Sequence, residues 1–414
     1  MKWWESDFTS VKGNKLHLAG RNAETLAREF GTPLYVYGKN AVLSRYDLLE
    51  SILAENAPRE GWICYAMKAN PHAGLLALLA KRGARIDAVS PNEVDAALAT
   101  GFPPERILFT GTSVSLADLE RLMPVDGLTL NIDAPEQLEM MGAFKRRACP
   151  RKRVRVSVRW NPGIGSGFNP RVITAGRRSS DGTPIKFGVE EGKVIGVFER
   201  ARALGFLPVG LHHHLGSGWV REDFETVREA ADKMVRMAGE LERRHVPLEF
   251  LDFGGGFGPR YARGQGLFPV APYLRHISRA VAKAGLRVRA VAVEPGKFLI
   301  GDAGALLLRV EYIKESYGNL FACVNGGTYN TVPRPAIYLQ AVHEIVNASR
   351  IDGRPRARLT VAGNLCETGD VFGKERLMPP TKSGDILAVL GAGAYCRSMA
   401  STFNLRDIPA EILV

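Results

Sequence analysis

Short apolar runs alternate with longer segments of helical apolar spacing along the larger, N-terminal part of the chain. Runs of this length are typical of strands buried in a parallel sheet. The eight runs are Ile63–Met67, Arg85–Val89, Ile107–Phe109, Leu128–Asn131, Val154–Arg159, Pro208–Leu211, Leu248–Asp252 and Val288–Val293. Strand followed by helix, repeated eight times, predicts a (β/α)8 barrel, and an open doubly wound sheet is the alternative.

Two of the intervening segments carry signals for the start of a helix. Ser90, Pro91 and Glu93 form the pattern of a capping box, in which a serine and a glutamate satisfy free backbone amides. Asp133 followed by Pro135 indicates a second helix N-terminus. Both signals come directly after predicted strands, as a barrel requires.

The pattern changes after about residue 305, where strand-length apolar runs are separated by turn residues. These runs are Leu306–Ile313, Phe321–Val324, Arg358–Val361 and Ile386–Leu390. Strand-like segments also occur near the N-terminus, at Leu16–Leu18 and Pro33–Tyr37. We therefore expect N-terminal strands in residues 1–38 that pack on a C-terminal β-sandwich or β-barrel domain in residues 305–414, with the barrel in residues 39–304.

Polar residues gather where the predicted barrel strands end. In (β/α)8 barrels the active site lies at the C-terminal ends of the strands. Most lysines are solvated surface charges, but a lysine at such a strand end is partly desolvated and can act as a nucleophile. Lys68 closes the first strand, and the others are Asp87 in the second, Arg159 at the end of the fifth, and His214, Gly254–Gly256 and Glu294 after the sixth, seventh and eighth.

Composition sets the outer bounds. A chain of 414 residues with 45% hydrophobic and 24% charged residues is an ordinary globular protein of two domains. We find no N-terminal apolar leader and no run long enough for a membrane span, so we expect a cytoplasmic protein with no membrane partner. The five cysteines show no metal spacing, which favours reduced thiols: Cys64, Cys149, Cys323, Cys366 and Cys396.

The net charge of +12 raises the question of a nucleic-acid partner. A basic run lies at residues 145–147 and continues at 151–153, near the end of a predicted helix. No aromatic residues interleave with it and no nucleic-acid motif is present, so a solvated face is the better interpretation. We expect no nucleic-acid partner and interpret the charge as suited to anionic small molecules.

A set of motifs resembles the fold-type III pyridoxal-phosphate decarboxylases, and among them the diaminopimelate decarboxylases most. The motifs occur in the family's order over nearly the whole chain: Tyr65–Asn70, His214–Gly218, Asp252–Gly258, Glu294–Lys297, Arg334–Tyr338, Cys366–Asp370 and Gly393–Ser401. The resemblance implies a pyridoxal 5'-phosphate barrel with a β domain. It also implies a homodimer with shared active sites that converts meso-diaminopimelate to L-lysine and CO2.

The resemblance also assigns roles to single residues. Lys68 resembles the lysine that binds the cofactor aldehyde, Glu294 the carboxylate that faces the pyridine nitrogen, and His214 the residue that stacks on the ring. The remaining residues expected to bind the cofactor are Asp87, Arg159, Ser217, Gly254, Gly255, Gly256, Gly296, Lys297 and Tyr395. A glycine-rich turn suits a phosphate because it lets the backbone approach closely.

Substrate binding and proton transfer are assigned to the C-terminal part of the chain. Cys366 resembles the family's proton donor, which reaches the active site from the partner subunit. An isolated cysteine is more often a small buried apolar group. Arg334 and Tyr338, with Lys297, resemble the residues that hold the distal carboxylate of the substrate, and Glu367 resembles the one that contacts its distal amine.

Two departures from the diaminopimelate pattern leave other substrates open. Lys297 stands where the family usually has arginine, and Asn325-Gly326-Gly327 replaces a more common Asp-Ala-Gly beginning. Ornithine, lysine, or a carrier- or citrate-linked amino acid are the alternatives. A racemase, a non-catalytic cofactor-binding protein and a metal site at His212 and His214 are weaker hypotheses, and the metal hypothesis lacks a third ligand nearby in sequence.

Overall fold

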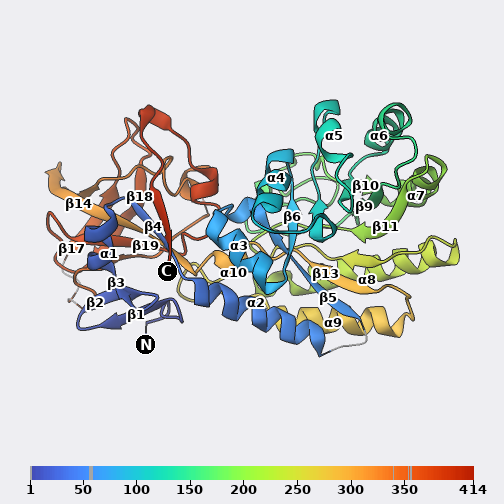
Figure 1. The fold of residues 1–414 in the computed structure, drawn as a ribbon. Helices are drawn as coiled ribbons and strands as arrows, with labels where there is room; N and C mark the ends of the chain where they lie inside the picture. Colours follow the sequence, from blue (N-terminus) through green and yellow to red (C-terminus); the bar gives the residue numbers. More distant parts are fainter. Residues whose placement is uncertain (1, 56–58, 339, 353, 355–356) are drawn as a thin grey trace. The chain divides into compact units, whose positions relative to one another are not determined.

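The computed structural model describes residues 2–55, 59–338, 340–352, 354 and 357–414. Eight parallel strands form a closed ring, because β9 pairs with β8 as well as with β11. They are β5 Glu60–Ala66, β6 Arg85–Ala88, β7 Ile107–Phe109, β8 Thr129–Ile132, β9 Arg155–Asn161, β11 Leu207–His212, β12 Phe250–Asp252 and β13 Ala290–Val293 (Figure 1). The predicted barrel is confirmed and the open sheet is wrong, since an open sheet would leave two unpaired edges.

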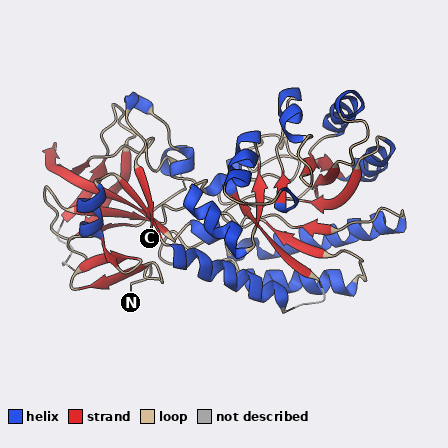
Figure 2. Ribbon diagram, in the orientation of Figure 1, coloured by secondary structure: helices blue, strands red, loops and turns tan. Residues whose placement is uncertain are grey.

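Helices alternate with the barrel strands and lie outside the ring (Figure 2). They are α2 Lys39–Ala54, α3 Ala73–Arg82, α4 Pro91–Ala99, α5 Leu116–Leu122, α6 Pro135–Ala148, α7 Val194–Ala203, α8 Phe224–Arg243 and α9 Val270–Lys283. Helix α4 begins as its sequence predicts: the Ser90 side chain accepts from the Glu93 amide at 3.2 Å. The Glu93 carboxylate, however, accepts from the amide of Val89 at 2.7 Å, one residue earlier than in a standard capping box.

A mixed sheet forms the second compact unit, which comprises residues up to Arg45, Pro259–Gln265 and everything from Lys297 onward. Its strands are β4 Leu34–Tyr37, β14 Gly304–Ser316, β15 Asn319–Val324, β16 Ile345–Asn347, β17 Ala357–Ala362, β18 Val371–Met378, β19 Ile386–Leu390 and β20 Ala410–Leu413. The N-terminal strand β4 lies between β14 and β20 in this sheet. A separate three-stranded sheet contains β1 Thr9–Lys12, β2 Lys15–Leu18 and β3 Arg21–Asn22.

Among the described residues, three short α-helices lie wholly within this unit: α1 Ala23–Phe30, α10 Lys297–Ile300 and α11 Arg334–Ile337. None of the helices among the described residues is both long and apolar enough to cross a membrane. The domain boundaries that the sequence analysis places at residues 38 and 304 stay a prediction.

The interior of the barrel changes character from one end to the other. Near the N-terminal ends of the strands, apolar side chains fill it, and the rings of Trp62 and Phe250 lie with their centroids 5.2 Å apart. Gly210 makes room for this packing, because a Cβ at that position would lie 2.3 Å from the Phe250 ring. Further along the strands, buried polar side chains replace apolar ones: Asp87, Asn131, Ser157, His212 and Asp252. The polar half of the barrel carries the candidate site.

Candidate active site

Lys68 lies in the single helical turn Met67–Ala69 that follows β5. Its ammonium group forms an ion pair with Asp87, whose other oxygen accepts from the Thr110 hydroxyl. The Lys68 side chain is 31% exposed, whereas that of Asp87 is fully buried. Burial, followed by the charge of Glu294, raises the pKa of Asp87, and Lys68 opposes this shift. The Lys68 amine is therefore held by a buried carboxylate, while its side chain remains partly exposed.

Glu294 follows β13 and is buried between two histidines of β11 and the loop after it. Its Oε1 lies 3.3 Å from Nε2 of His212, and its Oε2 lies 3.6 Å from Nδ1 of His214. Burial raises the pKa of Glu294, while Lys68 and Arg159 lower it. Burial lowers the pKa of His214 well below its usual value, so this imidazole is neutral.

Arg159 places a second buried cation in the same end of the barrel. Its Nε lies 3.8 Å from Oδ1 of Asp133, and its guanidinium carbon lies 4.5 Å from the centroid of the Phe187 ring. Asp133 also accepts hydrogen bonds from the Thr112 hydroxyl at 2.5 Å and from the Gly188 amide at 2.9 Å. Arg159 and Asp133 thus form a buried ion pair beside the site.

The glycine loop after β12 folds tightly against its neighbours. A Cβ on Gly255 would lie 2.1 Å from the backbone oxygen of Glu294, so only glycine fits there. The amide of Gly254 donates to Asp252 at 2.9 Å, and that of Gly255 donates to Nδ1 of His214 at 3.2 Å. Because both amides are used inside the protein, these two glycines provide close approach more than hydrogen-bond donors.

Two other predicted phosphate-binding segments are brought to this loop or to Lys68. Gly218, next to Ser217, donates its amide to the Gly256 oxygen at 2.7 Å. A Cβ on Gly296 would lie 2.9 Å from the Cβ of Ala69, the residue after Lys68. Ser217, the glycine loop and Gly296 therefore surround the same end of the barrel as the lysine.

The second unit holds a separate group of cationic side chains. Arg334 is buried, and it donates from Nη1 to Nε2 of His343 at 3.1 Å. Its guanidinium carbon lies 4.4 Å from the Tyr261 ring centroid. The ammonium of Lys297 lies 5.5 Å from the ring centroid of Tyr395. Burial, followed by the charge of Arg334, lowers the pKa of Lys297 well below its usual value.

The loop between β17 and β18 carries the predicted proton donor at the surface. Cys366 is exposed, and its amide donates to Oδ1 of Asn404 at 2.9 Å. Glu367 accepts from the Tyr329 hydroxyl at 3.2 Å. Tyr338 is half-buried directly after α11. The alternative of a buried packing thiol is wrong for Cys366, because its side chain faces solvent.

A comparison with known proteins places this geometry in a family. The family described as "Pyridoxal-dependent decarboxylase, pyridoxal binding domain" matches residues 45–301. A diaminopimelate decarboxylase of Methanothermobacter thermautotrophicus is 38% identical over 408 residues, covering 97% of this chain and 91% of the relative. The chain belongs to the pyridoxal-dependent decarboxylases.

Solved structures agree with this pyridoxal-dependent decarboxylase fold. The structure of diaminopimelate decarboxylase from Helicobacter pylori, complexed with L-lysine, has a TM-score of 0.85 at 30% identity and covers 95% of this chain and 94% of that one. The enzyme from M. jannaschii, also in complex with L-lysine, has a TM-score of 0.86 at 27% identity, covering 99% and 93%. This decarboxylase is therefore a carboxy-lyase by family, and the racemase and non-catalytic hypotheses are wrong.

Sequence reasoning missed the buried polar layer beneath the site of this decarboxylase. His212 was considered only together with His214 as a metal ligand, yet the structure groups it with Asp252 and Glu294, with one nitrogen or oxygen atom of each within 4.8 Å of the others. The signal in the sequence was weak: the seventh apolar run ends on Asp252 and the fourth on Asn131. A polar residue at the end of a predicted barrel strand can therefore be predicted to lie inside the barrel.

Proposed function

We propose that this enzyme decarboxylates meso-diaminopimelate to L-lysine and CO2, with pyridoxal 5'-phosphate held in the barrel. The observation that carries the proposal is the convergence of Lys68, Glu294 and the glycine loop at one end of a closed barrel. Relatives over nearly the full chain length are named diaminopimelate decarboxylases, and three solved structures of such enzymes are complexed with L-lysine.

The residues at this end of the barrel fit such a cofactor. Glu294 is buried and its Oε1 has no hydrogen-bond partner among the described residues, so this carboxylate keeps acceptor capacity for a protonated ring nitrogen. When bound, pyridoxal phosphate supplies an electron sink for the charge that CO2 loss leaves behind. Lys68 would hold the aldehyde carbon, Asp87 would orient the Lys68 amine, and the neutral ring of His214 would lie against the cofactor.

Phosphate binding is assigned to the loops that meet at this end of the barrel. Ser217 and Gly256 lie on segments joined by a backbone hydrogen bond, and Gly296 allows its chain to pass close to the Lys68 turn. Arg159 adds a fixed positive charge. Tyr395, with φ of 56°, would add a hydroxyl from the second unit, and Lys297 would add an ammonium.

The second unit supplies the groups proposed for substrate recognition. Arg334 is held by His343 and Tyr261, which suits a planar contact with the distal carboxylate, and Tyr338 follows it directly. Glu367 would contact the distal amine. Cys366, with its exposed side chain, would deliver a proton to the substrate carbon of the partner subunit in a cytoplasmic homodimer.

Lys297 supports keeping related substrates as a second candidate. Lysine is a compact point charge and does not reproduce the fork of an arginine, so the ligand that it faces differs in geometry from the usual one. Ornithine, lysine or a carrier- or citrate-linked amino acid are the candidates that this difference favours.

The test is product analysis by mass spectrometry. The protein, loaded with pyridoxal 5'-phosphate, is incubated in parallel with meso-diaminopimelate, L-ornithine, L-lysine and their D-forms. We expect diaminopimelate alone to be converted, with lysine as the product. Turnover of another amino acid with none of diaminopimelate would contradict the substrate and keep the reaction class, whereas no turnover of any amino acid would contradict the proposed reaction.

A further inference from the structure

Among the described residues, two buried carboxylates under the site form no ion pair with a lysine or an arginine. Lys68 is in contact with Asp87, and Arg159 forms an ion pair with Asp133, so each of these cations has its own carboxylate. Asp252 at the end of β12 and Glu294 after β13 remain. Asp252 is paired with Ala292 of the neighbouring strand, and Glu294 comes two residues later on the same face. The two acids are therefore neighbours inside the barrel.

Each acid of this pair has one buried oxygen without a hydrogen-bond partner among the described residues. Asp252 Oδ1 accepts from the Gly254 amide at 2.9 Å, but Asp252 Oδ2 and Glu294 Oε1 have no hydrogen-bond partner among the described residues. One nitrogen or oxygen atom of each of Asp252, Glu294 and His212 lies within 4.8 Å of the others. Leaving a buried acceptor without a donor is unfavourable. A single ring N–H of His212 can serve only one of these two oxygens, so a second donor is expected within this group.

His212 cannot neutralise either acid, because its hydrogen bonds fix a neutral ring. The Ser157 hydroxyl donates to Oδ1 of Asn131 at 2.7 Å, which turns the amide nitrogen of Asn131 towards Nδ1 of His212 at 2.8 Å. An amide nitrogen is a donor only, so Nδ1 accepts and the ring proton is on Nε2, 3.3 Å from Glu294 Oε1. Burial and Arg159 lower the pKa of His212 to about 3, which agrees with a neutral imidazole.

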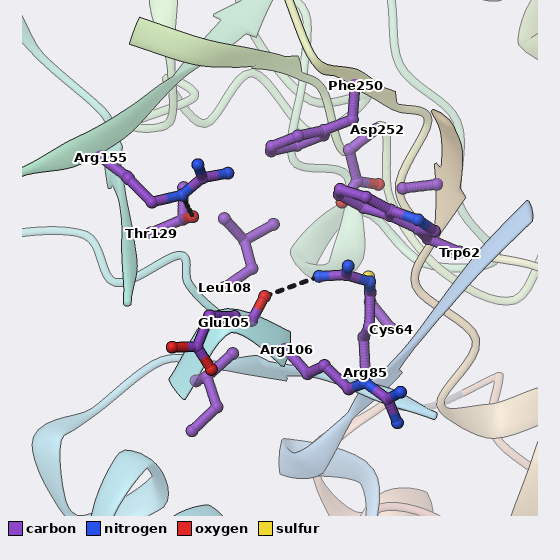
Figure 3. Close-up of a pocket in the computed structure, with 12 residues that line it drawn as sticks. Trp62, Cys64, Arg85, Glu105, Arg106, Leu108, Thr129, Arg155, Phe250 and Asp252 are labelled. Atoms are coloured by element: carbon purple, nitrogen blue, oxygen red, sulfur yellow. Dashed lines mark hydrogen bonds between the residues drawn. The ribbon is translucent and has the colours of Figure 1, made fainter. Parts of the chain in front are cut away.

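The surroundings of Asp252 on its other side do not solvate a charge. A cavity of about 20 Å³ lies there between Trp62, Cys64 and Phe250, with the guanidinium of Arg85 in its wall (Figure 3). It has room for about one water molecule, and one water does not replace the hydration of a carboxylate. Burial, followed by the charge of Glu294, raises the pKa of Asp252 well above its usual value. Two adjacent carboxylates in such a site do not both ionise.

We propose that Asp252 is a neutral carboxylic acid that donates a hydrogen bond to Glu294 and thereby holds Glu294 as the anion of the pair. The role towards the cofactor rests on the proposed function, since it is there that an anionic Glu294 is needed. Asp252 is a positioning residue in this scheme, because it acts only through Glu294. The other titratable or charged groups around the pair are Cys64 and Lys68 from β5 and its following turn, Arg85 and Asp87 from β6, Arg155 and Arg159 from β9, His212 and His214 from β11 and its loop, and Tyr273 from α9.

A neutral Asp252 has a defined effect on stability. Its folded pKa lies above its unfolded pKa, so its contribution is most favourable below the unfolded value and is lost as the pH rises through the folded one. Asp252→Asn keeps a neutral donor of the same shape, whereas Asp252→Leu keeps the branched shape with larger terminal groups and removes the donor. Asn at this position should abolish the part of the pH dependence that comes from Asp252.

The experiment uses the full chain without cofactor, and then with pyridoxal 5'-phosphate as the titrated probe. At neutral pH we expect an infrared band of a protonated carboxyl group in the wild-type protein that Asp252→Asn removes. Free energies of unfolding, measured against pH, should fall with rising pH in the wild type and fall less in Asp252→Asn. Asp252→Leu should bind the cofactor about 10- to 100-fold more weakly than Asp252→Asn, as followed by cofactor absorbance.

Other outcomes overturn the proposal. Absence of the carboxyl band in the wild type at neutral pH would show an ionised Asp252, and this measurement decides the matter even if a variant fails to fold. Equal loss of cofactor affinity in Asp252→Asn and Asp252→Leu would do the same. If the purified wild type contained zinc and Asp252→Asn did not, a metal ion and not a shared proton would hold the two carboxylates together, and the proposal would be wrong. If the protein shows the carboxyl band but decarboxylates no amino acid, Asp252 is still neutral and only the proposed function is wrong.

Discussion

The two ends of the barrel interior are built from the same strands but bury opposite kinds of side chain, apolar at one end and polar at the other. On β12, Phe250 at the N-terminal end packs on Trp62, while Asp252, two residues further on the same face, lies beneath the candidate site. Burying a phenylalanine side chain stabilises a fold by about 1.5 to 3 kcal/mol. Burying a carboxyl group costs free energy unless it is hydrogen-bonded or neutral. The apolar N-terminal end of the barrel interior therefore stabilises the fold, whereas the polar C-terminal end destabilises it.

The ion pairs at the two ends differ in the same way. Near the N-terminal ends, Arg155 and Glu249 lie 2.6 Å apart, and each side chain is at least one quarter exposed, at 28% and 25%. A pair so close to solvent contributes at most about 1 kcal/mol. At the other end Asp87 is fully buried beneath Lys68, and removal of its partner would leave an uncompensated charge. The charged groups at the C-terminal end thus belong to the candidate site, and the protein is stable only if each buried charge there keeps its partner.

Removing the amine at the polar end should have the largest effect. Lys68→Ala is expected to lower decarboxylation by about 10⁴-fold or more, because the covalent anchor of the cofactor is lost. Lys81→Ala, at an exposed position of α3, is the matched control and should leave turnover unchanged. Steady-state kinetics with the substrate found by product analysis measures both. Normal turnover in Lys68→Ala would contradict the whole assignment of the polar end.

The same variant tests whether subunits share sites. If the proposed homodimer forms, Lys68→Ala and Cys366→Ala proteins should each be almost inactive. A mixture that exchanges subunits should regain about a quarter of wild-type activity, since half of the dimers then have one intact site. No recovery after proven exchange would mean that both residues serve the site of their own subunit.

Truncation at the apolar end should affect stability and leave recognition intact. Leu108→Ala removes a buried side chain of the cluster around Trp62 and Phe250, and we expect a loss of about 2 to 5 kcal/mol in the free energy of unfolding. Leu116→Ala, which is 41% exposed at the start of α5, should change it by less than about 0.5 kcal/mol. Denaturant unfolding measures both, and KM of the folded Leu108→Ala protein should match the wild type. A raised KM would show that the two ends are coupled.

The barrel strands could be predicted because each is buried on both sides. Runs such as Ile107–Phe109 have the same bounds in the structure as in the sequence prediction. In the second unit, Ile386–Leu390 is also buried throughout and was predicted with its bounds. Strand β18 was missed because it carries Lys374, Glu375 and Arg376 on a largely exposed edge, and its pattern does not differ from that of a loop. Burial on both faces is the signal that sequence patterns carry.

The site was predictable where strand ends alone determine it. Lys68 follows β5 and Asp87 lies in the neighbouring strand β6, so the pairing of these two strands brings the side chains together. Contacts that join distant loops were beyond the sequence, such as the bond of the Cys366 amide to Asn404, 38 residues away. The group around Asp252 was missed because its neighbours are set by the register of β12 against β13, and register is not visible in one strand.

The smallest effect should come from the backbone that joins the polar layer to the glycine loop. Gly255→Ala places a Cβ 2.1 Å from the backbone oxygen of Glu294, and backbone cannot move aside as a flexible side chain can. We expect a loss of about 1 to 3 kcal/mol in the free energy of unfolding, together with weaker binding of pyridoxal 5'-phosphate, because the shift displaces Glu294. Gly196→Ala in α7 has nothing within 4 Å and should gain about 0.5 to 1 kcal/mol. Thermal unfolding and cofactor titration of both variants separate the cases. Full cofactor affinity in a destabilised Gly255→Ala protein would show that the glycine loop serves only the packing of the barrel. The loop would then belong to the stabilising end of the barrel interior and not to the end that carries the candidate site.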